Sequence, residues 1–243
     1  MSTIRMTQLM SKTRLFVDET LDVDSPLSLH GDQAKYLGRV LRLRPDDRIT
    51  VFDVSGDEYL ATIKTIRKDT VEACLVERLA TNAESPLQVT LIQGISRGDR
   101  MDFAVQKATE LGVTRICPVL TEYSVVKLDG KRAEKKKTHW RNIAISACEQ
   151  SGRSRLPQID APRSLGDLLA EYHNASTTRI VLQPGAGGSM RNLELPNDEI
   201  AILVGPEGGF SDTEVDNAAV AGFAPIGFGP RILRTETAAL AAI

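Results

Sequence analysis

The sequence predicts an α/β protein in two parts, a small N-terminal β-barrel and a larger C-terminal domain with a parallel sheet. Short β-rich runs fill much of the first 80 residues, whereas apolar runs alternate with segments of helical periodicity from Leu87 onward. A polar stretch that ends in proline, residues 81–86, separates the two patterns and is typical of a linker. A chain of 243 residues is long enough for two modest domains, which we expect at 14–80 and 87–243.

Three β-rich runs predict the barrel strands, at residues 49–54, 59–66 and 71–76. The residues Ser55-Gly56-Asp57 between the first two runs are typical of a hairpin turn. Apolar residues at helical spacing predict one helix over residues 32–41. Several short strands in so short a stretch favour a small barrel.

The C-terminal part alternates strands with helices, which favours a parallel sheet covered by helices. Apolar runs such as 200–204 fit strands that are buried on both faces. Ser211 and Glu214 form a capping box, which predicts that a helix begins there. The other expected strands are 89–92, 115–120, 180–182 and 224–228, and the other expected helices are 99–111, 133–151, 165–172 and 235–243.

Composition excludes several classes of protein. The chain carries 30 Lys and Arg against 32 Asp and Glu, so it is not a uniformly basic protein of the histone type. No apolar run approaches the length of about 18 residues that a membrane span needs, and the polar N-terminus does not resemble a signal peptide. The three cysteines are far apart and predict neither a disulfide framework nor a zinc site. We expect a cytoplasmic protein without a membrane partner.

The charges are nevertheless unevenly distributed along the chain. Residues 127–155 hold nine Lys or Arg against three Asp or Glu, a net charge of +6, whereas residues 156–243 have a net charge of −6. A local basic patch is what a polyanionic partner requires. A solvated, lysine-rich helix face explains the same charges, and the two interpretations stay open.

Three loops rich in glycine and proline follow predicted strands, at 183–188, 205–211 and 229–234. Ligands of open α/β sheets bind outside the carboxyl ends of the strands, so three such loops favour a ligand pocket over plain turns. The chain lacks a dinucleotide-binding GxGxxG after the first strand of this domain, a Walker A motif and a GxSxG nucleophile elbow. The residues alone therefore predict a small-molecule pocket and a basic patch.

Two paired segments identify a closer resemblance. Gly205–Ser211 (GPEGGFS) and Leu233–Ala238 (LRTETA) resemble the signature of the SPOUT methyltransferases, and in particular the RsmE family that methylates N3 of a uridine in 16S ribosomal RNA. The similarity runs from Arg14 to Ile243. It includes Arg14–Val17, Arg39–Leu43, Gly98–Asp102, Lys107–Val113 and Glu149–Arg153.

The resemblance implies a PUA-like, RNA-binding barrel and a SPOUT-type domain whose chain forms a deep trefoil knot. It also implies a homodimer that acts on 16S ribosomal RNA in the small ribosomal subunit, with S-adenosyl-L-methionine as methyl donor and no metal. The residues expected around the methyl donor are Leu182, Gln183, Gly205, Gly209, Phe228, Gly229, Ile232, Leu233 and Thr237.

Uracil N3 is a weakly acidic imide that must lose its proton before it attacks a methyl group. We expect Arg234 to stabilise the developing oxyanion, and Glu236 to act as the base or to orient Arg234. A carboxylate that merely favours a helix N-terminus is the alternative role for Glu236. The residues expected to contact RNA are Arg97, Arg100, Lys107, Arg153 and Arg155, with Lys135, Lys136 and Lys137 as outer charges.

Two other functions remain open at this point. One is a SPOUT enzyme that modifies another nucleotide or a ribose 2′-O, and the other is a module that binds RNA without catalysis.

Overall fold

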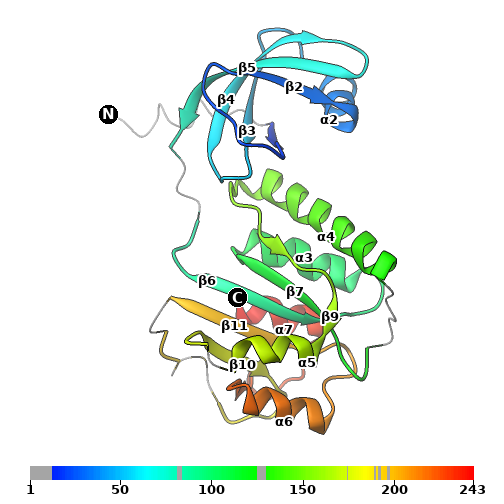
Figure 1. Ribbon diagram of the computed structural model, residues 1–243, viewed down its shortest axis with the longest axis vertical. Coiled ribbons are helices and arrows are strands. Elements are labelled where there is room, and N and C mark those ends of the chain that lie inside the picture. Colours follow the sequence, from blue (N-terminus) through cyan, green and yellow to red (C-terminus); the bar gives the residue numbers. More distant parts are fainter. Residues whose placement is uncertain are drawn as a thin grey trace. The chain divides into compact units, whose positions relative to one another are not determined.

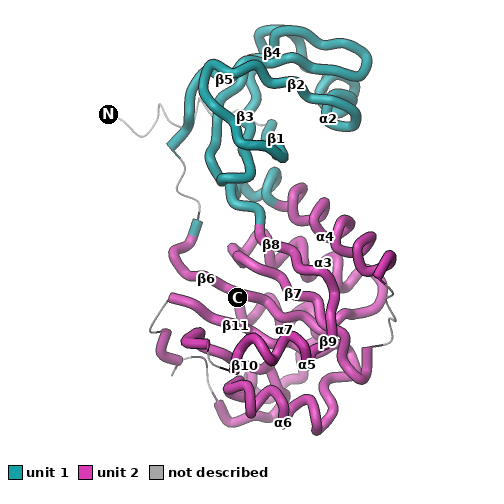
Figure 2. The backbone as a smooth tube through the Cα atoms, in the orientation of Figure 1, with its two compact units in different colours: residues 1–84, 148–156 teal, residues 85–147, 157–243 magenta. Residues whose placement is uncertain are grey.

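The computed structural model describes residues 13–80, 84–124, 130–173, 175–188, 190, 193–195 and 198–243. The chain divides into two compact units (Figure 2). Unit 1 holds Met1–Glu84 with Cys148–Leu156, and unit 2 holds Ser85–Ala147 with Pro157–Ile243. Residues 81–83 of the expected linker lie outside the described residues. Unit 1 thus includes Cys148–Leu156, a segment far along the chain from the rest of the unit. The sequence pattern did not predict this.

Unit 1 is a five-stranded sheet with the order β1-β3-β4-β5-β2, and Figure 2 labels its strands. Its strands are β1 (Arg14–Phe16), β2 (Pro26–His30), β3 (Arg48–Phe52), β4 (Glu58–Ile66) and β5 (Thr70–Leu79). The three predicted strands are confirmed as β3, β4 and β5, whereas β1 and β2 were not predicted. Because β1 and β2 form the two edges and do not pair in the described part of the chain, the expected barrel is confirmed in part, as a half-barrel sheet.

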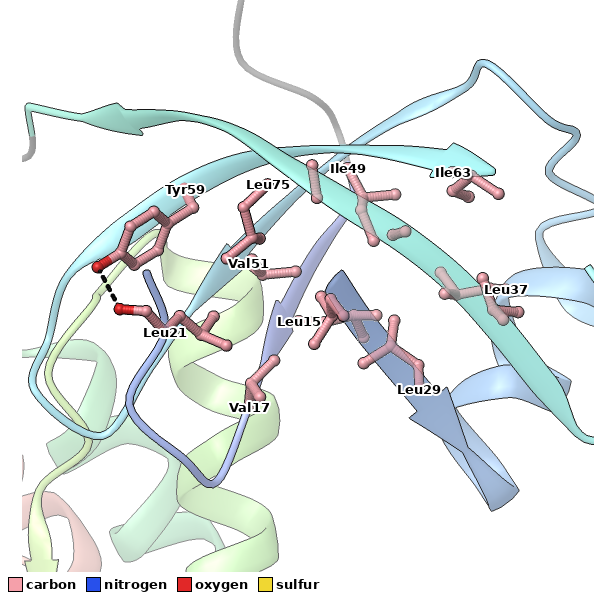
Figure 3. Close-up of a cluster of buried hydrophobic side chains, with 14 of the residues drawn as sticks. Leu15, Val17, Leu21, Leu29, Leu37, Ile49, Val51, Tyr59, Ile63 and Leu75 are labelled. Carbon is pink, nitrogen blue, oxygen red and sulfur yellow. Dashed lines mark hydrogen bonds between the residues drawn. The ribbon is translucent and has the colours of Figure 1, made fainter. Parts of the chain in front are cut away.

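The core of unit 1 lies against one face of this sheet. Figure 3 shows side chains from every strand of this sheet converging there, with the Tyr59 hydroxyl donating a hydrogen bond to Leu21 O at 2.9 Å. The predicted helix over residues 32–41 is confirmed as α2 (Gly31–Lys35), which continues as a π-helical turn, η1 (Tyr36–Val40). Leu37 of that turn is fully buried in the core. Apolar burial thus decides which side of the helical segment faces inward.

Polar contacts join the segment 148–156 to the rest of unit 1. Glu149 Oε1 accepts from Phe16 N at 3.1 Å, and Glu84 Oε2 accepts from Arg153 Nη2 at 2.7 Å. The Arg153 side chain is 4% exposed and that of Glu84 is 19% exposed. Burial alone would raise the pKa of Glu84, but the hydrogen bonds and charge of Arg153 outweigh it and hold the pKa below its usual value.

Replacing Glu84 by Ala should destabilise the protein by about 3 kcal/mol at pH 7, because the buried Arg153 guanidinium loses its counter-charge. Since the folded-state pKa of Glu84 is lowered, its contribution is complete above the unfolded pKa and is lost as the pH falls through the folded one. Urea unfolding at pH 7 and at acidic pH measures the difference. Glu77→Ala, at an exposed position of β5, is the control. An equal loss in both variants would contradict the prediction.

Unit 2 is built on a parallel sheet with the order β12-β10-β11-β6-β7-β8, and β9 also pairs with β7. All pairings in this sheet are parallel across the described strands. The strands are β6 (Gln88–Gly94), β7 (Arg115–Leu120), β8 (Gln158–Ile159), β9 (Arg163–Ser164), β10 (Thr178–Leu182), β11 (Glu199–Val204) and β12 (Ala224–Ile226). The five predicted strands are confirmed, and the two-residue strands β8 and β9 were missed.

Helices cover both faces of this sheet (Figure 1). They are α3 (Arg100–Glu110), α4 (Gly130–Ser151), α5 (Leu165–Leu169) with the 3₁₀ turn η2 (Ala170–Tyr172), α6 (Asp212–Val220) and α7 (Thr235–Ala242). One core cluster joins α5 and α6 to strands β6, β7, β10 and β11. Helices α3 and α7 contact each other, and α7 contacts β11. None of the helices in the described ranges is long and apolar enough to cross a membrane.

Candidate functional site

The three glycine- and proline-rich loops lie at one edge of the unit 2 sheet. They follow β10, β11 and β12, which are adjacent and parallel, so their carboxyl ends meet. The loops line one cavity of about 670 Å³, which we call the first cavity. This volume is in the range of small-molecule sites. Its apolar wall consists of Leu182, Val204, Phe210, Val215, Ile226, Phe228, Ile232 and Leu233.

Most of the residues expected around the methyl donor lie here. Those that line the first cavity are Leu182, Gln183, Gly205, Gly209, Phe228, Ile232 and Leu233. Gly229 is not among its lining residues, and Thr237 lines a neighbouring cavity. Arg234 and Glu236, expected to be catalytic, both line the first cavity.

A buried polar chain holds the wall of the first cavity in place. Gln93 at the end of β6 donates from Nε2 to Thr235 Oγ1 at 2.9 Å, and the Thr235 hydroxyl donates to Gly205 O at 2.5 Å. Gln93 and Thr235 are both buried. These bonds connect a strand end, the loop after β11 and the start of α7. The sequence carried little signal for Gln93, an amide that directly follows the predicted strand 89–92.

The loop after β11 is also tied to the start of α3 by Glu207. Its Oε1 atom accepts from Arg97 N at 3.1 Å and from Arg100 Nη1 at 2.6 Å. Burial opposes ionisation of Glu207, but backbone hydrogen bonds and the Arg100 guanidinium outweigh it and lower its pKa below the usual value. Glu207 therefore stays ionised at neutral pH and orients Arg100 at the cavity wall. Nothing in the sequence around Glu207 indicated this contact with α3.

A second cavity of about 900 Å³ adjoins the first and shares three wall residues with it, Arg100, Glu207 and Glu236. Two of the arginines expected to contact RNA, Arg97 and Arg100, line it. The rest of its wall consists of Gly98, Asp99, Phe103, Tyr123, Gly208 and Thr237. The two cavities thus meet at residues of the two predicted signature segments and of α3.

Arg234 and Glu236 lie at the start of α7, where Arg234 is the exposed N-cap residue. Glu236 belongs to the first helical turn, and its Oε2 atom is buried without a hydrogen-bond partner. In the described part of the chain no hydrogen bond or ion pair joins Arg234 to Glu236. Glu236 lines both cavities, and its carboxylate has an unmet hydrogen-bonding capacity at Oε2. Its place at a helix N-terminus also matches the alternative role of favouring the helix dipole.

The remaining residues expected to contact RNA have different surroundings. Lys107 pairs with Glu110 on α3 at 2.8 Å. Lys135 and Lys136 are exposed on α4, and the Lys136 ammonium lies 5.7 Å from the centre of the Trp140 ring. Lys137 on the same helix is half-buried. Lys127 of the basic stretch lies outside the described residues.

Arg153 and Arg155 belong to unit 1. The buried guanidinium of Arg153 is held by Glu84, which gives it a structural role there, whereas Arg155 is exposed and donates from its backbone N to the same carboxylate at 3.3 Å. A buried, paired arginine does not offer its charge to a phosphate. Of these two arginines, only Arg155 presents an exposed side chain.

Comparison with protein families identifies two matching models. A model described as an RNA methyltransferase domain matches residues 83–243, and one described as an RNA methyltransferase PUA domain matches residues 29–74. The first covers most of the chain.

Individual relatives agree with these models. The chain is 36% identical to ribosomal RNA small subunit methyltransferase E of Buchnera aphidicola from Schizaphis graminum, over 95% of this chain and 93% of that protein. It is 31% identical to the protein of the same name from Bacillus subtilis, over 95% and 94%. The crystal structure of a ribosomal RNA small subunit methyltransferase E from Neisseria gonorrhoeae bound to S-adenosyl methionine superposes with a TM-score of 0.88, at 40% identity, over 95% of this chain and 94% of that one.

Proposed function

Because the chain belongs to the ribosomal RNA small subunit methyltransferase E family, whose members depend on S-adenosylmethionine, we propose that it methylates N3 of a uridine in 16S ribosomal RNA. The observation that carries the proposal is the first cavity, formed by three loops at the strand ends, with a free glutamate on the wall that it shares with the second cavity. One cavity serves the methyl donor and the other is open to the acceptor.

The first cavity fits S-adenosylmethionine in size and in character. Its wall combines apolar side chains with loop backbone, which suits an adenine ring and a methionine chain that need shape and backbone hydrogen bonds. A Cβ atom built on Gly209 would meet no protein atom within 4 Å, so the space beside it is free for a ligand. The residues proposed to hold the donor are Leu182, Gln183, Gly205, Gly209, Phe228, Gly229, Ile232, Leu233 and Thr237. When bound, the donor supplies a sulfonium methyl group.

Glu236 and Arg234 carry the chemistry in this proposal. The Glu236 carboxylate accepts the proton of uracil N3, because its Oε2 atom is buried without a protein partner. The Arg234 guanidinium stabilises the negative charge that then develops on the uracil oxygens. The absence of an ion pair between the two side chains in the described residues supports a direct role for Glu236 over the orientation of Arg234.

RNA is proposed to bind along basic residues at the second cavity and elsewhere on the two units. Arg97 and Arg100 lie at the second cavity, Lys107 and Lys135–Lys137 lie on α3 and α4, and Arg155 lies in unit 1. The region 14–80 is the proposed RNA-binding domain and 87–243 the catalytic domain, which work on the ribosomal RNA in the cytoplasm. The PUA model supports the first assignment. Arg153 is left out because its charge is buried against Glu84.

Two further properties belong to the proposal. A trefoil knot is supported by the path of the chain: β12 lies at the sheet edge beside β10, yet the following α7 contacts β11 and α3, so the chain returns across the strand order. A homodimer is supported by α7, which carries no charged residue after Glu236, and by the turn between α3 and β7, where Leu111 is 55% exposed.

Mapping the methylated nucleotide tests the proposed function. Ribosomal RNA and small subunits from a strain without this protein are incubated with the purified protein and isotope-labelled S-adenosylmethionine, and the digested RNA is analysed by mass spectrometry. We expect one labelled N3-methyluridine in 16S ribosomal RNA. If the label is found on another nucleotide or on a ribose 2′-O, the acceptor differs from the one proposed. If the protein binds RNA but transfers no label, it is a non-catalytic binding module.

A further inference from the structure

We propose that the second cavity receives the acceptor uracil after it has left the RNA stack, with the rings of Tyr123 and Phe103 as its stacking surfaces. The inference rests on the proposed function and adds the position of the acceptor base. N3 lies on the Watson–Crick edge of uracil, so the base must be unpaired before it reacts. A flipped base needs a pocket beside the reacting groups, and the second cavity meets the first at Glu236.

Two aromatic rings in this cavity are unusually open to solvent. Phe103 of α3 is 44% exposed and Tyr123, which follows β7, is 49% exposed. Both line the second cavity. Aromatic side chains that stay exposed leave a large apolar face uncovered, and such faces stack on the bases of single-stranded nucleic acids.

Tyr123 has an exposed side chain on a turn whose backbone is held by hydrogen bonds. Its turn is closed by the bond from Ser124 N to Thr121 O at 3.0 Å, and Glu122 N donates to Glu214 Oε1 at 2.8 Å. The second oxygen of Glu214 accepts from Ser211 N at 3.0 Å in the predicted capping box, so one carboxylate joins this turn to the loop after β11. Because the backbone on either side of Tyr123 is already held, the turn itself needs little ordering when the ring stacks on a base.

The backbone at Gly208 lies close against the Tyr123 side chain. A Cβ atom at Gly208 would lie 2.9 Å from Tyr123 Cβ, closer than side chains pack, so only glycine lets the tyrosine lie against this loop. Gly208 is part of the GPEGGFS segment, whose neighbours Gly205 and Gly209 line the first cavity. Residues of the same loop therefore line both cavities.

Two arginines bring positive charge to the second cavity, whose wall also carries the carboxylates of Asp99, Glu207 and Glu236. Arg97 and Arg100 line it together with the two rings, and Glu207 holds Arg100 at 2.6 Å. Cations beside aromatic surfaces match the phosphates that flank a flipped base. An apolar protein partner would not require this pairing of arginines with exposed rings, so we favour RNA over a contact with another protein chain.

The inference is tested by comparing the RNA affinities of the wild type and the ring variants, each measured with and without the acceptor base. This test does not rely on turnover. The probe is the shortest RNA that the wild-type protein methylates, compared with the same RNA carrying an abasic site at the mapped uridine. Affinities are measured by fluorescence anisotropy in the presence of S-adenosylhomocysteine. We expect wild-type protein to prefer the intact RNA by roughly 5- to 100-fold, which is the effect of stacking one base. Tyr123→Ala and Phe103→Ala should each remove most of this preference.

Tyr36→Ala is the matched control, because Tyr36 is similarly exposed, at 43%, and lies in unit 1. It should keep the wild-type preference even if overall RNA affinity falls. Tyr123→Leu, which keeps apolar bulk but loses the aromatic face, replaces Tyr123→Ala if the latter fails to bind S-adenosylmethionine normally in calorimetry.

An unchanged preference in both ring variants would overturn the inference while leaving the methylation itself intact. A changed oligomeric state together with an unchanged preference would assign the rings to a protein contact and would also overturn it. If the wild-type protein methylates no RNA at all, the proposed function fails instead. The two failures are therefore distinguishable.

Discussion

Glu236→Gln is expected to reduce the single-turnover rate of methyl transfer by about 10²- to 10⁴-fold, the usual contribution of a positioned general base. Glutamine keeps the shape of the side chain but cannot accept a proton from uracil N3. The Oε2 atom of Glu236 has no protein partner, so the substitution breaks no bond to that oxygen within the described structure. Rates are measured with labelled S-adenosylmethionine, and donor affinity is measured separately by calorimetry and should be unchanged.

The dependence of the rate on pH distinguishes a base from an orienting group. Without a protein base the proton must go to solvent, so the rate of the Glu236→Gln variant should keep rising through the alkaline range. Asp216→Asn on α6, at an exposed position, is the control and should keep the wild-type rate and profile. If the Glu236→Gln variant keeps the wild-type rate, Glu236 is not the base. Its remaining role is then the favourable interaction of a carboxylate with the N-terminus of a helix.

Gly209→Val is expected to weaken binding of S-adenosylmethionine by roughly 5- to 100-fold, because about 1–3 kcal/mol of backbone strain must be relieved by moving the loop. Gly209 has φ of 71° and lines the first cavity. Valine resists positive φ, and its methyl groups would project into space that no protein atom fills. Calorimetry on the folded variant measures the affinity.

A second glycine provides the matched control for backbone strain. Gly112 follows α3 with φ of 105°, has no atom within 4 Å of a built Cβ, and does not line either cavity. Gly112→Val should therefore lower stability yet bind S-adenosylmethionine like the wild type. If the Gly209→Val variant binds S-adenosylmethionine as tightly as the wild type, the loop after β11 is not part of the donor site.

Much of the secondary structure follows from local patterns. The alternation of apolar strands and helices, the capping box at Ser211 and Glu214, and the three strand-end loops all depend on residues close together in the chain. The strands that were missed, β1, β2, β8 and β9, are short, with five residues or fewer. Such strands form because a distant partner is available, as when β1 pairs with β3, and a local pattern cannot show that partner.

The candidate site divides in the same way. The loop residues around the first cavity were predictable because parallel strands bring their carboxyl ends to one edge of a sheet. The motif resemblance added Arg234 and Glu236. Neither source indicated that Gln93 bonds Thr235, which is 142 positions away, or that Glu207 holds the start of α3.

The amino-acid sequence alone therefore determines which helices and strands form and at which edge of the sheet the loops meet. It does so because hydrophobic periodicity and turn chemistry act over a few residues. Which polar groups find each other depends on packing. Arg153 illustrates this: its charge in a basic stretch predicted a phosphate contact, but in the folded unit it is buried against Glu84. A buried charge requires a partner, and only the folded arrangement brings a carboxylate 69 positions away within 2.7 Å.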